Sequence, residues 1–306
     1  FAKLLFVRQC TAQRLWHIVC CFVGGGIKGA AHIGVLQSLE EHNINIDYIS
    51  GTSSGSIVAT LYSIGYSPSE IYNFFKHYSK DITHIGFKNI FKLISGLLLK
   101  HKIIIDGLND GKKLEKIMYK ICAKKDIYTI DQINLPLLIP SVNIENGETY
   151  IFTSKKIRNV YQDNYVYDNS ILVSKAVRAS CSFPGIYSPC HYQNKILVDG
   201  GIREIIPWKG TKKLGANTVL SIIFERTLEP DPFLDILEII TKSINLLSHE
   251  LSLYEQSGSD YVLKINTLNT SLLDISKIDF LYNLGYSSMN NFLGKNNWNK
   301  KLCKFE

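Results

Sequence analysis

Residues 18–65 repeat one arrangement twice, in the order apolar strand, turn of small residues and amphipathic helix. In the first copy, the apolar run Ile18–Val23 leads into three glycines, Gly24–Gly26, and then into a helical pattern over Ala30–His42. In the second copy, a short strand over Asn43–Ser50 leads into a stretch of serines and glycines and another helix. Two such units in succession predict an α/β fold with a mostly parallel central sheet, whose functional loops lie at the carboxyl ends of the strands.

The rest of the chain continues this alternation without an obvious linker. A third helix has a complete start signal in Ser67, Pro68 and Glu70, which form a predicted capping box. The later predicted elements are a helix over Gly111–Ala123, a hairpin turn at Asn146-Gly147, a turn at Phe183-Pro184-Gly185, and helices over Pro232–Glu255 and Lys277–Leu293. We therefore expect one domain over residues 18–295, with an N-terminal extension of uncertain origin at 1–17 and a basic tail at 296–306.

The composition is that of a globular protein, with 45% hydrophobic and 20% charged residues in 306. No apolar run reaches the roughly 18–20 uncharged residues that span a bilayer. The net charge of +7 is compatible with acidic partners such as an anionic membrane surface and equally with plain solubility, and no nucleic-acid-binding motif accompanies it. The seven cysteines include no C-x-x-C pair with metal-ligand spacing, so we expect no metal site and a reducing, cytoplasmic location.

The second turn contains the pattern G-x-S-x-G, read as Gly51-Thr52-Ser53-Ser54-Gly55. A strand precedes it and a helix follows it, as a nucleophile elbow requires. In such an elbow the central residue lies on a sharp turn, and its neighbours two positions away must lack side chains. Only Ser53 has glycine at both positions, so it is the candidate nucleophile.

The first turn, Gly24-Gly25-Gly26-Ile27-Lys28-Gly29, can present backbone N–H groups at the start of a helix. The residues also formally match a dinucleotide-binding loop, which needs an acidic residue at the end of the second strand. Asp47 lies within that strand, and Ser53 is at its end, where a cofactor would compete with the nucleophile. We therefore predict an oxyanion hole in which the amides of Gly25 and Gly26 are the donors, and Lys28 either adds positive charge or is solvated.

The strongest candidate for the base is Asp199, which ends the apolar strand "ILVDGG". Gly200 and Gly201 follow it and leave space for close approach. A Ser-Asp-His triad in the usual chain order would need His249, which lies in the middle of an apparent amphipathic helix. A catalytic histidine is expected on a loop at the strand ends, so the triad is the weaker hypothesis.

Four stretches resemble the patatin-like phospholipase family in order and spacing, and they cover most of residues 19–208. They are GGGIKGAAHIGVLQSLEE, DYISGTSSGSIVATLYSIGYSP, AVRASCSFPGIYSP and VDGGIREIIPW. The bacterial cytosolic-type branch of the family is the most similar. Two positions depart from the family pattern: Ile205 stands where Asn is usual, six residues after the aspartate, and Val23 stands where Ser is often found.

The resemblance implies a three-layer α/β/α sandwich with a mostly parallel central sheet. It also implies a Ser53–Asp199 dyad that needs no histidine, an oxyanion loop at Gly24–Gly29, no cofactor, and a lipid or phospholipid substrate. Ser53 would attack an acyl ester and Asp199 would accept its proton.

Apolar residues at helical spacing, interspersed with lysines, occupy His84–Ile105. This segment is either a helix packed on the core or a lid that touches lipid.

The predicted function is therefore that of a serine lipid acyl hydrolase of phospholipase A, lysophospholipase or esterase type. Two alternatives remain: an α/β-hydrolase-type esterase with a Ser-Asp-His triad, and a non-catalytic lipid-binding patatin-like domain.

Overall fold

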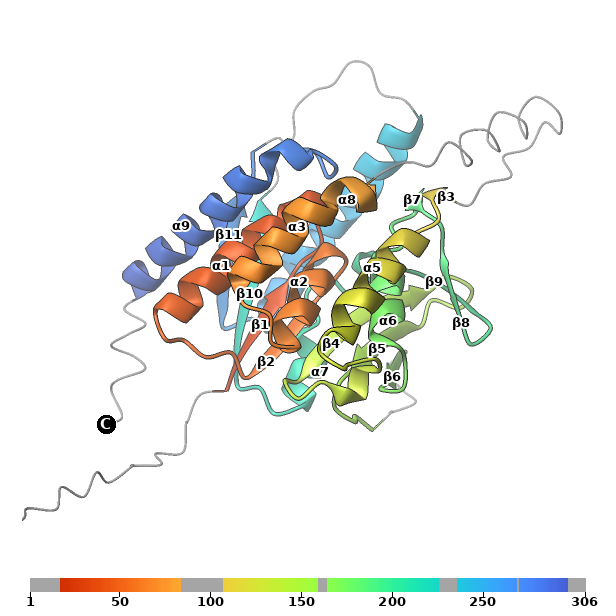
Figure 1. Ribbon diagram of the computed structural model, residues 1–306, viewed down its shortest axis with the longest axis horizontal. Coiled ribbons are helices and arrows are strands. Elements are labelled where there is room, and N and C mark those ends of the chain that lie inside the picture. The colour runs from red at the N-terminus through yellow and green to blue at the C-terminus, as the bar shows by residue number, and fades with distance from the viewer. Residues whose placement is uncertain (1–16, 84–106, 159–163, 226–235, 269, 297–306) are drawn as a thin grey trace, which may run out of the picture.

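The computed structural model describes residues 17–83, 107–158, 164–225, 236–268 and 270–296 (Figure 1). The segment 84–105, predicted to be either a helix packed on the core or a lid, lies outside these ranges. All but one residue of the predicted extension at 1–17, and all but one of the predicted tail at 296–306, also lie outside them.

The described elements alternate along the chain as expected from the sequence. The strands are β1 (Ile18–Phe22), β2 (Tyr48–Gly51), β3 (Gly107–Asn109), β4 (Leu137–Asn143), β5 (Thr149–Thr153), β6 (Tyr165–Asp168), β7 (Gly185–Tyr187), β8 (Cys190–Tyr192), β9 (Lys195–Asp199), β10 (Thr218–Glu225) and β11 (Tyr261–Asn266). The helices are α1 (Gly29–Glu41), α2 (Ser54–Ser63), α3 (Pro68–Thr83), α5 (Lys112–Ala123), α6 (Val173–Ser180), α7 (Trp208–Lys213), α8 (Ile236–Glu255) and α9 (Ile278–Asn296). Short 3₁₀ turns follow β1 and β9, namely η1 (Gly26–Lys28) and η3 (Gly200–Ile202).

A central sheet of nine strands runs in the order β11-β10-β1-β2-β4-β5-β6, with β9 paired to β4 and β8 to β9. The pairs from β11 to β4 are parallel, whereas β4 pairs antiparallel with both β5 and β9. β4 continues past the end of β2, and Asp199, at the end of β9, pairs with Ser141 in this part of β4. The antiparallel β9 therefore ends at the same edge of the sheet as β1 and β2. This edge holds the predicted functional loops.

Helices cover both faces of the sheet, and the alternation of side chains along β1 shows how. Ile18, Cys20 and Phe22 face a large core formed with α1, α2, α3, α5, α6 and α9. Val19 and Cys21 face a smaller core packed against Trp208 of α7 and Leu251 of α8. In Figure 1, α1, α3 and α5 lie in front of the sheet and α8 lies behind it. This arrangement confirms the predicted three-layer α/β fold with a mostly parallel sheet.

Most of the predicted element boundaries hold in the structure. The capping box is present: the backbone N–H of Ser67 donates to Oε2 of Glu70 (2.8 Å), and the N–H of Glu70 donates to Oγ of Ser67 (3.3 Å). One strand prediction was too long, because the predicted strand at 43–50 begins only at Tyr48. Asn43 instead has a φ of 56° and its N–H bonds to the carbonyl oxygen of Glu40, so these residues close α1 before the chain enters the sheet.

Among the helices within the described ranges, none combines the length and the apolar character needed to cross a membrane.

Candidate active site

Ser53 lies in the turn between β2 and α2, with φ of 51° and ψ of −126°. A positive φ is unusual for a residue with a side chain, and such backbone strain is concentrated at functional sites. The flanking glycines are required by close packing: a Cβ atom at Gly51 would lie 2.3 Å from the carbonyl oxygen of Gly55, and one at Gly55 would lie 2.5 Å from that of Phe22. The G-x-S-x-G pattern thus forms the strained strand–helix turn that the sequence predicts.

The glycine loop after β1 lies beside Ser53. Gly24, Gly25 and Gly26 line the same pocket as Ser53, and a Cβ atom at Gly24 would lie 2.8 Å from the Cβ atom of Ser53. The amides of Gly24 and Gly25 donate no hydrogen bond within the part of the chain that the structure describes. Unpaired N–H groups next to a hydroxyl are the arrangement that stabilises an oxyanion.

The rest of this loop is held in place by the segment before η5 (Ile275–Lys277). Gly26 has a φ of 57°, and a Cβ atom there would lie 2.3 Å from the carbonyl oxygen of Leu272. The N–H of Ile27 donates to that same oxygen at 2.8 Å. Lys28 is half-buried in η1 and Gly29 begins α1, and neither is among the described residues that line the pocket. Of the predicted oxyanion loop, the structure therefore places the three glycines and Ile27 at the pocket.

Asp199, at the end of β9, lines the same pocket as Ser53. Its side chain is buried, with 2% exposure, and Oδ1 accepts a hydrogen bond from the N–H of Gly201 at 2.8 Å. Oδ2 has no hydrogen-bond partner among the described residues. Gly200 is required for close packing, because a Cβ atom there would lie 2.4 Å from the carbonyl oxygen of Pro140.

The surroundings of Asp199 favour its protonated form more than water does. Burial raises its pKa to about 7, although the Ser53 hydroxyl and the Gly201 amide each lower it in part. Within the described residues, no hydrogen bond joins the Ser53 hydroxyl to Oδ2 of Asp199. A carboxyl group with a pKa near neutrality can accept and return a proton in the same reaction cycle.

The end of α6 bridges the backbones of Ser53 and Asp199. Oγ of Ser180 accepts the N–H of Ser53 at 3.0 Å, and the carbonyl oxygen of Ser182 accepts the N–H of Asp199 at 3.0 Å. Ser180 and Ser182 are both fully buried. The sequence did not identify these two serines as site residues, because the bonds join segments that are far apart in the chain.

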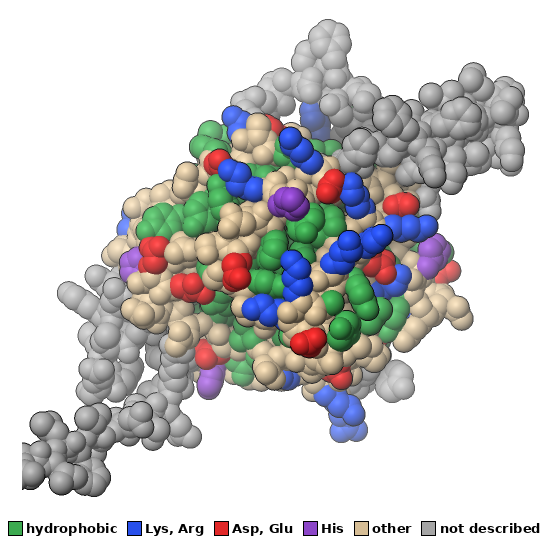
Figure 2. All heavy atoms as spheres, viewed as in Figure 1, with side chains coloured by type: hydrophobic (Ala, Val, Ile, Leu, Met, Phe, Trp, Pro, Cys, Tyr) green, Lys and Arg blue, Asp and Glu red, His purple; other side chains and the backbone are tan. Residues whose placement is uncertain are grey.

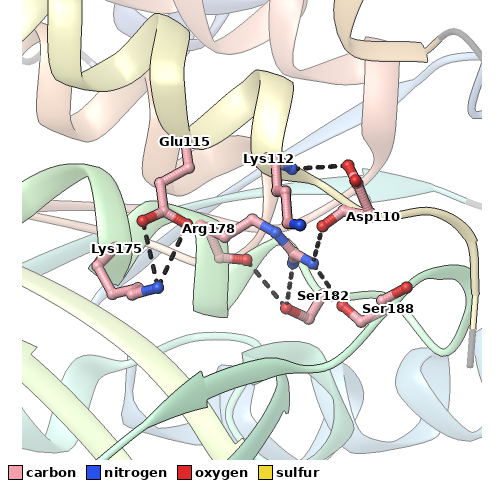
Figure 3. Close-up of polar contacts among 7 residues, drawn as sticks. All are labelled: Asp110, Lys112, Glu115, Lys175, Arg178, Ser182 and Ser188. Carbon is pink, nitrogen blue, oxygen red and sulfur yellow. Dashed lines mark hydrogen bonds and ion pairs between the residues drawn. The ribbon is translucent and has the colours of Figure 1, made fainter.

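Arg178 anchors this end of α6 (Figure 3). Its guanidinium group, buried with 3% exposure, donates to Oγ of Ser182 and to the carbonyl oxygens of Asp110 and Ser188. Gly111 gives it room, since a Cβ atom there would lie 1.9 Å from Nε of Arg178. One guanidinium group therefore fixes three chain segments around the site.

A mainly apolar pocket opens from Ser53 and Asp199, with a volume of about 180 Å³. Its walls come from α2, α3 and α5, and their apolar members are Ile57, Leu61, Phe74, Phe75, Tyr78, Ile82, Leu114, Ile117, Met118 and Ile121. On the face drawn in Figure 2, hydrophobic side chains reach the surface near these helices, with basic side chains beside them. The sequence predicted the helix α5 but not that one side of it forms a pocket wall.

Two other assignments, a triad with His249 and a dinucleotide-binding loop with Asp47, receive less support. His249, half-buried on α8, is not among the described residues that line the pocket, whereas its neighbours Asn245 and Ser248 are. Oδ2 of Asp47 accepts the N–H of Ile18 at 3.0 Å, so this carboxyl lies at the start of β1, and the glycine loop lies at its end. No group of three potential metal ligands occurs among the described residues.

The model of the family "patatin-like phospholipase" matches residues 20–211. This chain belongs to the patatin-like phospholipase family. The match confirms the predicted family and supports the prediction of a lipid ester hydrolase.

Similar proteins occur in fungi, a virus and bacteria. Lysophospholipase NTE1 of Meyerozyma guilliermondii is 27% identical over 199 residues, which are 65% of this chain but only 12% of that protein. Uncharacterized protein R571 of Acanthamoeba polyphaga mimivirus is 28% identical over 291 residues, covering 87% of this chain and 90% of that protein. The crystal structure of VipD from Legionella pneumophila aligns with 92% of this chain and 67% of its own, at 14% identity and a TM-score of 0.48.

Proposed function

We propose that this patatin-like phospholipase is a serine lipid acyl hydrolase that uses Ser53 and Asp199. The observation that carries the proposal is the placement of a strained serine and a buried aspartate in one apolar pocket. Oδ2 of this aspartate has no hydrogen-bond partner among the described residues. Asp199 accepts the proton of Ser53 while the Ser53 oxygen bonds to the acyl carbonyl carbon. The bond to the alcohol oxygen then breaks, and the alcohol leaves with that proton.

Water completes the reaction at the acyl-enzyme. It gives a proton to Asp199 and attacks the acyl carbon, and Ser53 regains a proton as the fatty acid leaves. In both halves of the reaction the amides of Gly24, Gly25 and Gly26 would stabilise the negative oxygen. One donor of this kind is typically worth about 3–4 kcal/mol of transition-state stabilisation.

The pocket supports a lipid as the acyl substrate. Its walls on α2, α3 and α5 offer almost only aliphatic and aromatic side chains, which suit a hydrocarbon chain and not a polar acyl group. The curated relatives named lysophospholipase NTE1 agree with a lysophospholipid or a related ester as the substrate.

A fluorophosphonate probe and hydrolysis of a short p-nitrophenyl ester test the proposal. We expect the probe to label Ser53, and Ser53→Ala and Asp199→Asn each to lower kcat by at least about 1,000-fold with an unchanged circular dichroism spectrum. His249→Ala should react at the wild-type rate. Full activity of either dyad variant would refute the dyad, a large loss in His249→Ala would support the triad, and a folded wild type that neither reacts nor is labelled would support a non-catalytic lipid-binding domain.

We also propose that α8 brings the pocket to a lipid surface. Its outward side is apolar, with Ile239, Ile240, Leu246, Leu247, Leu253 and Tyr254 all exposed. Leu247 and Tyr254 are exposed by 72% and 75%. The same helix contributes Asn245 and Ser248 to the pocket, so α8 forms part of the pocket wall with another of its sides.

Co-sedimentation with vesicles tests this contact. We expect Leu247→Asn combined with Tyr254→Ser to weaken binding to vesicles of phosphatidylcholine and phosphatidylserine, whereas Tyr119→Ser, at an exposed site on α5, should not. Equal binding of all three proteins would refute a role for α8. The net charge of +7 predicts weaker binding to vesicles without phosphatidylserine. The cytoplasmic location remains a prediction.

A further inference from the structure

Two buried carboxyl groups lie directly behind the Asp199 loop and take no part in the proposed chemistry. Glu204 is five residues after Asp199, and Glu255 is the last residue of α8; they are exposed by only 1% and 6%. Acidic side chains are almost never buried so completely unless their oxygens have partners. The partners of Glu255 show what its burial achieves.

Glu255 holds two backbone amides of the segment after Asp199. Its Oε2 accepts the N–H of Ile205 at 2.9 Å and the N–H of Ile206 at 2.8 Å. Ile205 stands where the sequence comparison expected an asparagine, and its side chain has no polar group. A carboxyl group from α8 thus binds the backbone at this position.

The same segment is bound from its other side by the nucleophile elbow. Oγ1 of Thr52 donates to the carbonyl oxygens of Glu204 (3.1 Å) and Ile205 (3.0 Å). Thr52 is fully buried and directly precedes Ser53. The peptide groups around Ile205 are therefore held by Glu255 through their N–H groups and by Thr52 through their carbonyl oxygens.

Glu204 and its neighbours complete this polar cluster. The hydroxyl of Tyr165 donates to Oε2 of Glu204, and Lys209 and Arg203 lie near enough to lower the pKa of Glu204. Burial, followed by the proximity of Glu204, raises the pKa of Glu255 to about 8. Both effects favour the neutral form of Glu255, and an amide oxygen in the same place can accept the same two N–H groups.

We propose that Glu255 is a positioning residue for the Ser53–Asp199 site, which fixes residues 204–206 so that Thr52 holds the elbow in its strained conformation. The inference rests on the proposed hydrolase function for its kinetic part only. Its structural part, that Glu255 immobilises this segment, is measurable in the protein without substrate.

Hydrogen exchange and kinetics of the full chain together test the inference. In Glu255→Ala and in Glu255→Asp, whose shorter side chain withdraws from the amides, we expect faster exchange in peptides containing Ile205, Ile206 and Thr52. We also expect kcat for a short ester to fall by about 10-fold to 100-fold with little change in KM. Glu255→Gln should keep the exchange rates and kcat near those of the wild type. If the negative charge of Glu255 were required, this variant would lose activity. Glu250→Ala, at an exposed position on the same helix, is the matched control and should change neither.

The results separate the two proposals. Wild-type exchange and kcat in Glu255→Asp and Glu255→Ala would overturn the positioning role, and if Glu255→Ala does not fold, Glu255→Asp decides alone. A fall in kcat together with unchanged exchange would also overturn it, because the effect would not pass through residues 204–206. If the wild type is inactive, the hydrolase function fails, and the exchange data still decide whether Glu255 holds the segment.

Discussion

At the scale of single residues, the site depends on a backbone conformation at Ser53 and a burial of Asp199 that are both unfavourable in free energy. A positive φ at a residue such as Ser53 costs on the order of 1–3 kcal/mol, and persists only where the surroundings enforce it. Two hydrogen bonds hold Ser53 in this conformation. Oγ of Ser56 donates to the carbonyl oxygen of Ser53 at 2.6 Å, and Oγ of Ser180 accepts the N–H of Ser53. Burial of Asp199 is also unfavourable, because it disfavours the ionised carboxylate and raises its pKa to about 7.

The raised pKa of Asp199 predicts the acid limb of the pH–rate profile. Only the ionised carboxylate can accept the Ser53 proton, so kcat/KM should fall about tenfold per pH unit below pH 7 and level off above it. Rates for a short neutral ester between pH 4.5 and 9 would show this limb. A plateau that extends down to pH 5 would mean that Asp199 has an ordinary pKa, or that it is not the base.

At the scale of elements, two helices approach closely through a pair of glycines. A Cβ atom at Gly34 of α1 would lie 2.0 Å from the carbonyl oxygen of Tyr282 in α9, and one at Gly285 of α9 would lie 1.9 Å from that of Ala31 in α1. Since α1 begins at the glycine loop, α9 also supports the predicted oxyanion hole.

This contact predicts opposite effects of the same substitution at two positions of α9. Gly285→Ala forces backbone atoms apart and should lower the free energy of unfolding by about 1–3 kcal/mol. Gly294→Ala meets open space and should raise it by up to about 1 kcal/mol, because alanine favours the helix. Urea unfolding of both variants measures the difference. Equal stability of the two variants would contradict the close packing of α1 and α9.

The pocket walls make a prediction about α5. Ile117 lines the pocket, and a larger side chain there should fill the space for a long acyl chain. We expect Ile117→Phe to lower kcat/KM for a sixteen-carbon ester much more than for a four-carbon ester. Tyr119→Phe, on the exposed side of α5, is the control and should keep the wild-type ratio. An unchanged ratio in Ile117→Phe would place the acyl chain elsewhere.

At the scale of the whole molecule, buried titratable groups link stability to pH. Burial raises the pKa of Asp199 and Glu204 to about 7 and that of Glu255 to about 8, from ordinary values near 4. The folded protein then binds more protons than the unfolded chain between pH 4 and 8, so these groups contribute stability that is lost as the pH rises. His32, stacked between Phe22 and Phe224, acts in the opposite sense: burial lowers its pKa to about 4, so it contributes stability that is lost as the pH falls from 6.5 to 4.

Below pH 6.5, the three carboxyl groups and His32 change the stability in opposite directions as the pH changes. Of these four groups, only the carboxyl groups change it above pH 6.5. We therefore expect the urea midpoint to fall from pH 6.5 to pH 8, and the fall to be smaller in Glu255→Gln. A midpoint that rises over this interval would show that these carboxyl groups do not retain their protons in the folded state.

How far the sequence predicts this molecule depends on how local each feature is. The glycines around Ser53 and after β1 constrain short stretches of backbone, so the elbow, the glycine loop and the parallel sheet follow from local patterns. The strand before Asp199 and the glycines after it made Asp199 the strongest candidate for the base, and the family resemblance implied that it forms a dyad with Ser53 without a histidine. The bonds of Ser180, Ser182 and Glu255 to the site join distant segments through ordinary polar side chains, and no local pattern marks them.

The hydrogen bonds at the end of α6 have a consequence for how the site tolerates motion. Ser180 and Ser182 are two residues apart at the end of α6, so Ser53 and Asp199 are hydrogen-bonded to the same short segment. A displacement of α6 carries both residues in the same direction, so their separation changes less than either position. The distance between the proposed proton donor and acceptor is therefore less sensitive to a shift of α6 than the position of either residue.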